Sequence, residues 1–145
     1  MKHIFEQTVY YADTDAYGVA WHGSYIRWME QARVEFCRDI GLDLVDLKNN
    51  SIMIPVTNLS LRYKSSAFLD ERIFVETEIT KITPLVIQFT QTIRNKKTEK
   101  IHTIGTIEVV AVNNEGKIYR KIPEKLKSIC ENAMTEQVCQ DLTNI

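Results

Sequence analysis

The chain has 145 residues, of which 44% are hydrophobic and 26% are charged, an ordinary composition for one soluble globular domain with its own core. Eighteen basic and nineteen acidic residues leave a formal net charge of −1, which argues against nucleic acid or an anionic membrane as a partner. No apolar run approaches the roughly 18 residues of a membrane span, and the N-terminus lacks the apolar core of a signal peptide. We therefore expect one cytoplasmic domain over residues 1–145, with no integral membrane segment.

The first part of the chain predicts a strand, a loop and a long helix. Residues 3–11 alternate as in a strand, and residues 12–23 contain turn formers and two glycines, as in a loop. Apolar residues then recur at helical spacing from Ser24 to Ile40. We expect Ser24 to cap the start of this helix and Gly41 to end it.

Antiparallel strands follow the helix. Period-two alternation predicts four of them, over residues 55–63, 72–82, 85–94 and 101–113. The last of these ranges is long for a strand, so we expect it to bend near Gly105.

The C-terminal part predicts smaller elements. After a turn at Asn114-Glu115-Gly116 we expect a short strand at 117–121, a short helix beginning at Pro123 and a C-terminal tail over about 133–145. The order of elements predicts an α+β fold, with one long helix laid across a curved antiparallel sheet of about five to six strands. The second face of this sheet reads as fairly apolar and its edges are long, so we expect at least a dimer to cover them.

The loop before the long helix contains the residues best suited to chemistry, Asp13, Asp15 and His22. A helix N-terminus presents unpaired N–H groups and a partial positive charge, which can hold a developing oxyanion. Gly18 and Gly23 would let a ligand approach the backbone there. A carboxylate beside such a helix end suits hydrolysis of an activated carbonyl. The same spacing also fits helix capping or turn formation, with no catalytic role.

The segment from Tyr11 to Tyr25, followed by Ile-Arg-Trp-Met-Glu-Gln-Ala-Arg33, resembles the signature of hotdog-fold acyl-CoA thioesterases. The likeness is to the 4-hydroxybenzoyl-CoA thioesterase group and its YbgC-type branch, and it covers about residues 3–132. It implies a hotdog fold and hydrolysis of acyl-CoA to free CoA and a carboxylic acid. It also implies no cofactor beyond the CoA of the substrate, no metal, and a homodimer or homotetramer with active sites between subunits.

The resemblance also implies roles for individual residues. Asp15 matches the catalytic carboxylate, acting as general base or as nucleophile, and His22 matches a histidine whose backbone N–H points at the thioester carbonyl. The N-terminal amides of the helix would hold the oxyanion. Tyr17 and the Ala20-Trp21 pair differ from the family pattern, which would reshape the acyl pocket. Substrate contacts are implied for Tyr17, Gly18, Val19, Trp21, Gly23, Tyr25, Asn58 and Ser60.

Simpler roles suit several other residues. Asp13 is expected to hydrogen-bond the loop backbone, and His3 and His102, without partners at metal-ligand spacing, are expected to be ordinary strand side chains. Cys37 suits the core, and the three widely spaced cysteines suit reduced thiols. The open alternatives for function are a thioesterase acting on acyl-carrier protein, a hotdog hydratase and a non-catalytic acyl-thioester binding module.

Overall fold

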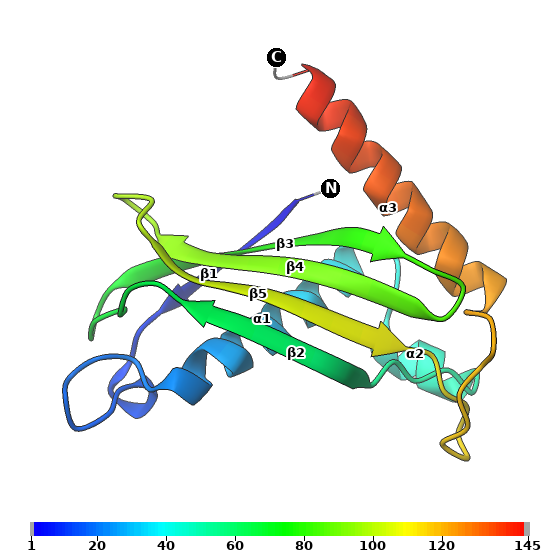
Figure 1. Ribbon diagram of the computed structural model, residues 1–145, viewed down its shortest axis with the longest axis horizontal. Helices are drawn as coiled ribbons and strands as arrows, with labels where there is room; N and C mark the ends of the chain where they lie inside the picture. The colour runs from blue at the N-terminus through cyan, green and yellow to red at the C-terminus, as the bar shows by residue number, and fades with distance from the viewer. Residues whose placement is uncertain (1, 144–145) are drawn as a thin grey trace.

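Five antiparallel strands form a sheet in the order β1-β3-β4-β5-β2 within residues 2–143, the part of the chain that the computed structural model describes, with side chains described for residues 2–135. Figure 1 shows this sheet with the helices packed behind it and at its ends. The strands are β1 (His3–Thr8), β2 (Val56–Tyr63), β3 (Arg72–Ile82), β4 (Val86–Asn95) and β5 (Ile101–Val110).

The helix α1 (His22–Asp39) crosses one face of the sheet (Figure 1). Its buried residues recur at helical spacing and include Trp28, Met29 and Phe36, all at most 1% exposed. Burying each large apolar side chain contributes about 1.5–3 kcal/mol. Gly105 of β5 lies under this helix, since a Cβ there would meet Met29 at 3.0 Å and Leu61 at 2.7 Å. Close contact with α1 therefore accounts for this glycine.

The two ends of α1 differ in how well the sequence predicted them. Gly41 ends the helix as expected: its φ is +94°, its N–H donates to the Arg38 carbonyl at 3.1 Å, and the next N–H, from Leu42, donates to Cys37 at 2.7 Å. This is the Schellman arrangement. The prediction that Ser24 is the N-cap is wrong, because the helix begins two residues earlier, after Trp21, and Ser24 lies buried inside its first turn.

The segment between α1 and β2 contains a short helix that the sequence pattern did not predict. This helix, α2, spans Leu44–Asn49. Asp43 caps it, since its Oδ1 accepts from the N–H groups of Val45 at 2.9 Å and Asp46 at 3.1 Å. The short apolar pattern carried too little periodicity to separate a helix of this length from a loop.

The C-terminal helix is longer than predicted. The helix α3 spans Glu124–Thr143, so most of the segment expected to be a tail is helical, while residues 144–145 lie outside the described residues. Leu126, Cys130 and Ala133 form its buried face. The expected strand at 117–121 is also wrong, because Ile118 forms only an isolated bridge with Val112.

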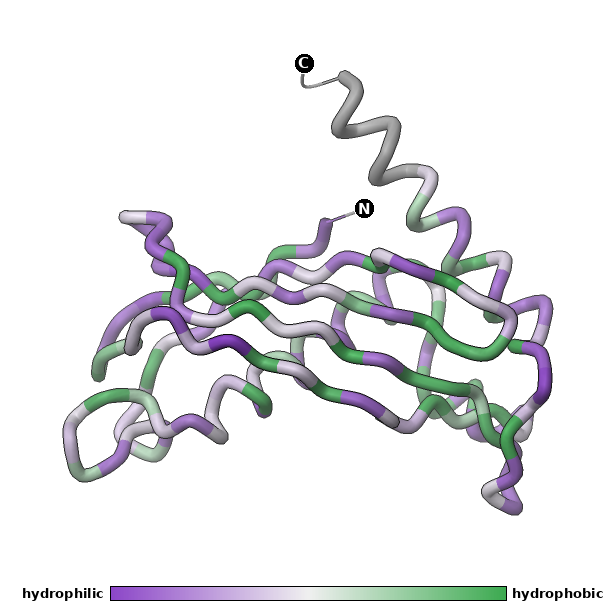
Figure 2. The backbone as a smooth tube through the Cα atoms, in the orientation of Figure 1, coloured by the Kyte–Doolittle hydropathy of each residue, from purple (hydrophilic) through white to green (hydrophobic). Residues whose placement is uncertain are grey.

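The second face of the sheet is mostly polar, which corrects the expectation of an apolar face. Along β3, β4 and β5 buried residues alternate with half-buried ones, and Figure 2 shows this alternation of hydrophobic and hydrophilic residues along the strands. Polar and charged side chains make up most of this face. They include Glu76, Glu78, Gln88, Thr90, Thr92, Arg94, Thr106 and Glu108.

Strand β2 is an open edge of the sheet. It pairs with β5 on one side, and seven of its eight residues are exposed, with only Leu61 half-buried. Val56 is 46% exposed and Leu59 39%. An exposed edge with apolar side chains is a ready site for pairing with another strand.

Candidate active site

Asp13 anchors the loop that precedes α1. Its side chain is buried at 4% exposure, where Oδ2 accepts from the Tyr10 N–H at 2.9 Å and Oδ1 forms an ion pair with Arg27. Its carbonyl oxygen accepts from the Trp21 N–H and from the Ser24 hydroxyl, both at 2.8 Å. Asp13 is thus fully engaged in holding the loop to the helix, in agreement with the structural role expected from sequence.

Asp15 lies at the start of a tight loop and keeps one carboxylate oxygen free. Its N–H donates to Val19 at 2.9 Å, its carbonyl accepts from Gly18 at 3.1 Å, and its Oδ1 accepts from the Tyr17 N–H at 2.8 Å. The φ of +79° at Gly18 requires a glycine in this loop. Oδ2 of Asp15 has no hydrogen-bond partner within the described part of the chain, so it is available to a ligand or a water molecule.

A pocket of about 350 Å³ lies beside Asp15. Figure 1 shows how it forms, because the start of α1 and the loop before it lie next to the C-terminal end of β2. Asp15, Ala20, His22 and Tyr25 line one side, and the consecutive residues Tyr63, Lys64, Ser65 and Ser66 line the other.

Two tyrosines join the sides of this pocket. The rings of Tyr25 and Tyr63 meet edge to face at 5.4 Å, and the Tyr63 hydroxyl donates to the His22 carbonyl at 2.7 Å. The Tyr25 oxygen accepts from the Ala67 N–H at 3.0 Å. Burial raises the pKa of Tyr25, and the nearby negative charge of Asp15 adds to this shift. Tyr25 therefore remains a neutral phenol whose proton can still be donated.

The first turn of α1 offers backbone donors to this pocket. The N–H groups of His22 and Gly23 have no acceptor within the described residues, as the first positions of a helix require. A Cβ on Gly23 would lie 2.3 Å from the ring of Trp21. The space at Gly23, expected to admit a ligand, is thus filled by the Trp21 indole, which is itself 52% exposed.

Of the other residues predicted to contact the substrate, some lie in the loop beside the Asp15 pocket and others lie away from it. Val19 forms a bridge with Phe68, and Tyr17 is 90% exposed beside the pocket loop. Asn58 and Ser60 do not line the Asp15 pocket of their own chain. They pair with Glu108 and Thr106 on the polar face of the sheet, because strand alternation turns them away from α1.

Tyr63, Ser65 and Ser66 were not predicted as site residues. Nothing in their spacing distinguishes them, since only the packing of β2 against the first turn of α1 brings them to Asp15. Within the described residues no group of three or more His, Cys, Asp or Glu side chains could hold a metal ion. None of the helices, over the residues described, is long and apolar enough to cross a membrane.

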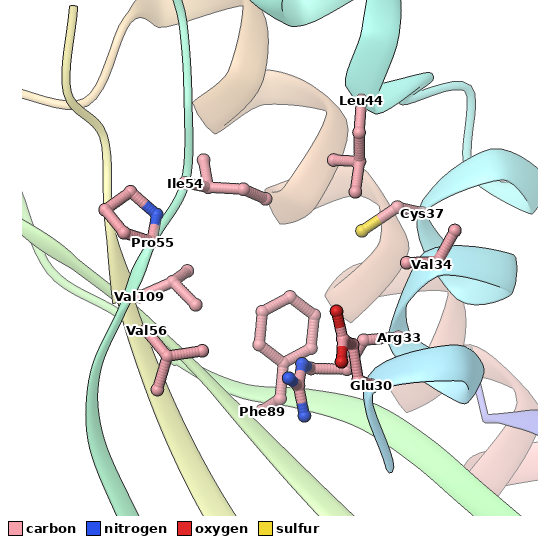
Figure 3. A pocket seen from close by; sticks show the side chains of 10 residues that line it. All are labelled: Glu30, Arg33, Val34, Cys37, Leu44, Ile54, Pro55, Val56, Phe89 and Val109. Carbon is pink, nitrogen blue, oxygen red and sulfur yellow. The ribbon is translucent and has the colours of Figure 1, made fainter. Parts of the chain in front are cut away.

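A second, apolar cavity of about 250 Å³ lies at the opposite end of β2 (Figure 3). Among its lining side chains only Glu30 and Arg33 are charged, and Arg33 donates to Gln91 at 2.9 Å. Burial raises the pKa of the Cys37 thiol in this cavity to about 11, so that thiol is neutral and packs as a core residue, as expected. The apolar lining consists of Val34, Cys37, Leu44, Ile54, Pro55, Val56, Phe89 and Val109.

Comparisons with known proteins place this fold and site in a family. The family profile described as the thioesterase-like superfamily matches residues 9–131. The chain is 37% identical over 87 residues to the acyl-CoA thioester hydrolase YbgC of Escherichia coli, a match that covers 60% of the chain and 65% of that protein. It is 34% identical over 110 residues to the acyl-CoA thioesterase YbgC of Haemophilus influenzae, covering 75% of the chain and 79% of that protein.

The structure agrees with these matches. The DHNA-CoA thioesterase from Staphylococcus aureus superposes with a TM-score of 0.83 at 27% identity, covering 99% of this chain and 95% of that one. The fold is therefore the hotdog fold, as predicted. The chain belongs to the thioesterase-like superfamily, and the resemblance to its YbgC-type members is confirmed. The prediction of a thioester hydrolase is confirmed at the level of this family.

Proposed function

We propose that this protein is an acyl-CoA thioesterase in which Asp15 is the catalytic carboxylate. The observation that carries the proposal is the Oδ2 of Asp15, without a hydrogen-bond partner among the described residues, in a pocket that is also lined by His22, the first residue of α1. The N–H groups of His22 and of the next residue, Gly23, have no acceptor within the described residues. A carboxylate beside free amide donors at a helix start supplies groups that thioester hydrolysis uses.

With Asp15 as general base, its carboxylate takes a proton from water as the water oxygen bonds to the thioester carbon. The carbonyl oxygen then carries negative charge, which the His22 and Gly23 amides stabilise by hydrogen bonds. When the C–S bond breaks, the CoA thiolate takes the proton back from Asp15 and the carboxylic acid is released. With Asp15 as nucleophile, its carboxylate would instead bond to the thioester carbon, the C–S bond would break to release the CoA thiolate, and water would then hydrolyse the mixed anhydride to the carboxylic acid and free Asp15.

A homodimer formed through β2 is part of the proposal. A two-fold axis beside the open edge would pair β2 with its own copy in antiparallel orientation. The Tyr63 end of one strand would then lie next to the Val56 end of the other, although within one chain these ends are about 23 Å apart. Support for this arrangement comes from the exposed Val56 and Leu59 on that edge.

Such pairing would bring the apolar cavity of one subunit close to the Asp15 pocket of the other. The cavity is lined mainly by aliphatic side chains and so suits an acyl group, while the Asp15 pocket would hold the thioester. Asn58 and Ser60, near the middle of β2, would lie beside the subunit boundary, where the pantetheine arm is expected. We further propose a cytoplasmic location, as expected from the sequence.

The test is thiol release from a panel of short, medium, long and aryl acyl-CoAs, with Asp15→Asn measured in parallel. We expect turnover of some members and a loss of about 10²–10⁴-fold in the variant, with unchanged fold and assembly. Release that is equally fast in Asp15→Asn would contradict the role of Asp15. Thiol release from an acyl-carrier protein alone, or saturable binding with no release, would instead point to the carrier-protein enzyme or to the binding module.

A further inference from the structure

A partly buried chain of hydrogen bonds leads from the Asp15 pocket into the sheet. Ser65, which lines the pocket, has its Oγ 2.8 Å from Nδ1 of His102, and Nε2 of His102 lies 2.5 Å from Oε2 of Glu71. His102 is only 2% exposed. The sequence predicted an ordinary strand side chain here, because its two partners lie 31 and 37 residues away along the chain.

The contacts of Ser65 favour one placement of the protons. Its Oγ donates to the carbonyl of Ile101 at 2.8 Å, and a carbonyl can only accept. The contact between Ser65 and His102 therefore needs a proton on Nδ1, so that the ring donates to the serine oxygen. One further proton then lies between Nε2 and the Glu71 carboxylate. This arrangement satisfies all three contacts, with one ring N–H of His102 facing Ser65 and the other facing the half-buried Glu71 carboxylate.

This arrangement leaves His102 without a lone pair to activate Ser65, so Ser65 is not poised as a nucleophile. The Ser65 oxygen still has one unused lone pair. Its direction is fixed because the hydroxyl donates to the Ile101 carbonyl and the oxygen accepts from Nδ1 of His102. The backbone reinforces this position, because the N–H groups of Lys64 and Ser65 both donate to the His102 carbonyl, at 2.7 and 3.2 Å.

We propose that Ser65 is a further active-site residue, whose oxygen accepts a hydrogen bond from the water that attacks the thioester. The proposal rests on the proposed function of Asp15, which lines the same pocket and whose Oδ2 has no hydrogen-bond partner among the described residues. Asp15 and Ser65 would each accept one hydrogen of that water, which leaves its lone pair to face the thioester carbon. His102 and Glu71 are positioning residues that act through Ser65.

The experiment compares steady-state thiol release by the full-length protein and its variants on the best acyl-CoA of the panel. Ser65→Ala should lower kcat about tenfold, which corresponds to the loss of one positioning hydrogen bond, with KM changed by less than about twofold. Ser65→Thr keeps the hydroxyl and should recover most of the rate. Ser128→Ala, on the surface of α3, is the matched control, since that hydroxyl contacts Glu124 outside the pocket.

The positioning residues have their own readouts. His102→Gln should lower kcat to the same extent as Ser65→Ala, and the double variant should be no slower, because the two residues act as one unit. In ¹⁵N-edited NMR spectra of the wild-type protein, both ring nitrogens of His102 should carry protons. This measurement stands even if the His102 variant does not fold.

Different results would overturn different parts of this proposal. An unchanged kcat in Ser65→Ala, or a rise confined to KM, would overturn the role in holding water. An unprotonated Nδ1 on His102, or an acyl group trapped on Ser65 and detected by mass spectrometry, would overturn the hydrogen-bond assignment. Loss of turnover in Asp15→Asn with full turnover in Ser65→Ala would overturn this inference alone, whereas no thiol release by the wild type would overturn the proposed function along with it.

Discussion

The hydroxyl of Tyr63, at the end of β2, donates a 2.7 Å hydrogen bond to the carbonyl of His22 in the first turn of α1. This bond ties the open edge strand to the helix start that supplies the amide donors of the proposed oxyanion site. The aromatic contact of Tyr63 with Tyr25 at 5.4 Å supports the same junction. The position of the helix start relative to Asp15 therefore depends on a strand that lies some 40 residues later in the chain.

Tyr63→Phe tests this junction. The substitution keeps the ring contact and removes the hydrogen bond, so we expect a loss of about 0.5–1.5 kcal/mol in the free energy of unfolding. We also expect a several-fold fall in kcat/KM, because the helix start is less firmly placed. Chemical denaturation and thiol release measure the two effects. A variant with full activity would show that the helix start holds its position without Tyr63.

Replacement by asparagine should mainly lower stability at Asp13 and mainly lower turnover at Asp15. Asp13→Asn weakens the ion pair of a buried carboxylate with the half-exposed Arg27 and the hydrogen bond from Tyr10, so we expect a loss of about 1–3 kcal/mol of stability. Asp15 is half-buried and its Oδ2 has no hydrogen-bond partner among the described residues, so Asp15→Asn should change the melting temperature little while it lowers turnover by about 10²–10⁴-fold. Thermal unfolding of the two variants side by side checks the contrast. Equal destabilisation would contradict the separation of the two roles.

Gly23→Ala should displace the indole of Trp21. The added Cβ would lie 2.3 Å from that ring, and the ring is half exposed and free to move outward. Replacing a helical glycine by alanine gains up to about 1 kcal/mol of helix propensity, so stability should change little. Trp21 fluorescence, measured in a Trp28→Phe background, should shift to longer wavelength. An unchanged spectrum would mean that the alanine is accommodated by a shift of the backbone.

The two buried thiols, Cys37 and Cys130, should make the protein less stable at alkaline pH. Burial raises the pKa of Cys37 to about 11 and that of Cys130 to about 12, whereas in the unfolded chain a thiol titrates near about 8.5. Above that pH the unfolded state loses protons that the folded state keeps, so stability falls by up to about 1.4 kcal/mol per pH unit for each thiol. Urea titrations at several pH values between neutrality and about pH 10 measure this slope. Replacing both cysteines by alanine should flatten it.

Charge on the β2 edge should break the proposed dimer. Leu59→Lys places an ammonium group on an edge strand that we expect to pair with its own copy, and lysine on such edges opposes strand addition. We expect the variant to sediment as a monomer at concentrations where the wild type is dimeric. Thr80→Lys, at an exposed position of β3 on the polar face, is the control. A variant that remains dimeric would place the subunit interface elsewhere.

Much of the fold could be predicted from local pattern. Strand alternation predicted the strands corresponding to β2, β3 and β4 to within one residue at either end, and helical spacing predicted α1 to within two residues at its start. The end of α1 at Gly41 was correct because a left-handed φ at a helix end favours glycine in any fold. The start was wrong because Ser24 has a buried acceptor, the carbonyl of Asp13, that local sequence does not reveal.

The sequence by itself determined the family, the loop that carries Asp15 and the periodicities of the helix and sheet, because these depend on neighbouring residues. Only the tertiary structure decided which residues share the pocket with Asp15. Tyr63 and Ser65 reach it through the packing of β2, and His102 joins them through β5. Hydrogen bonds between residues far apart in sequence leave no periodic signal, so their partners become visible only when the strands are paired.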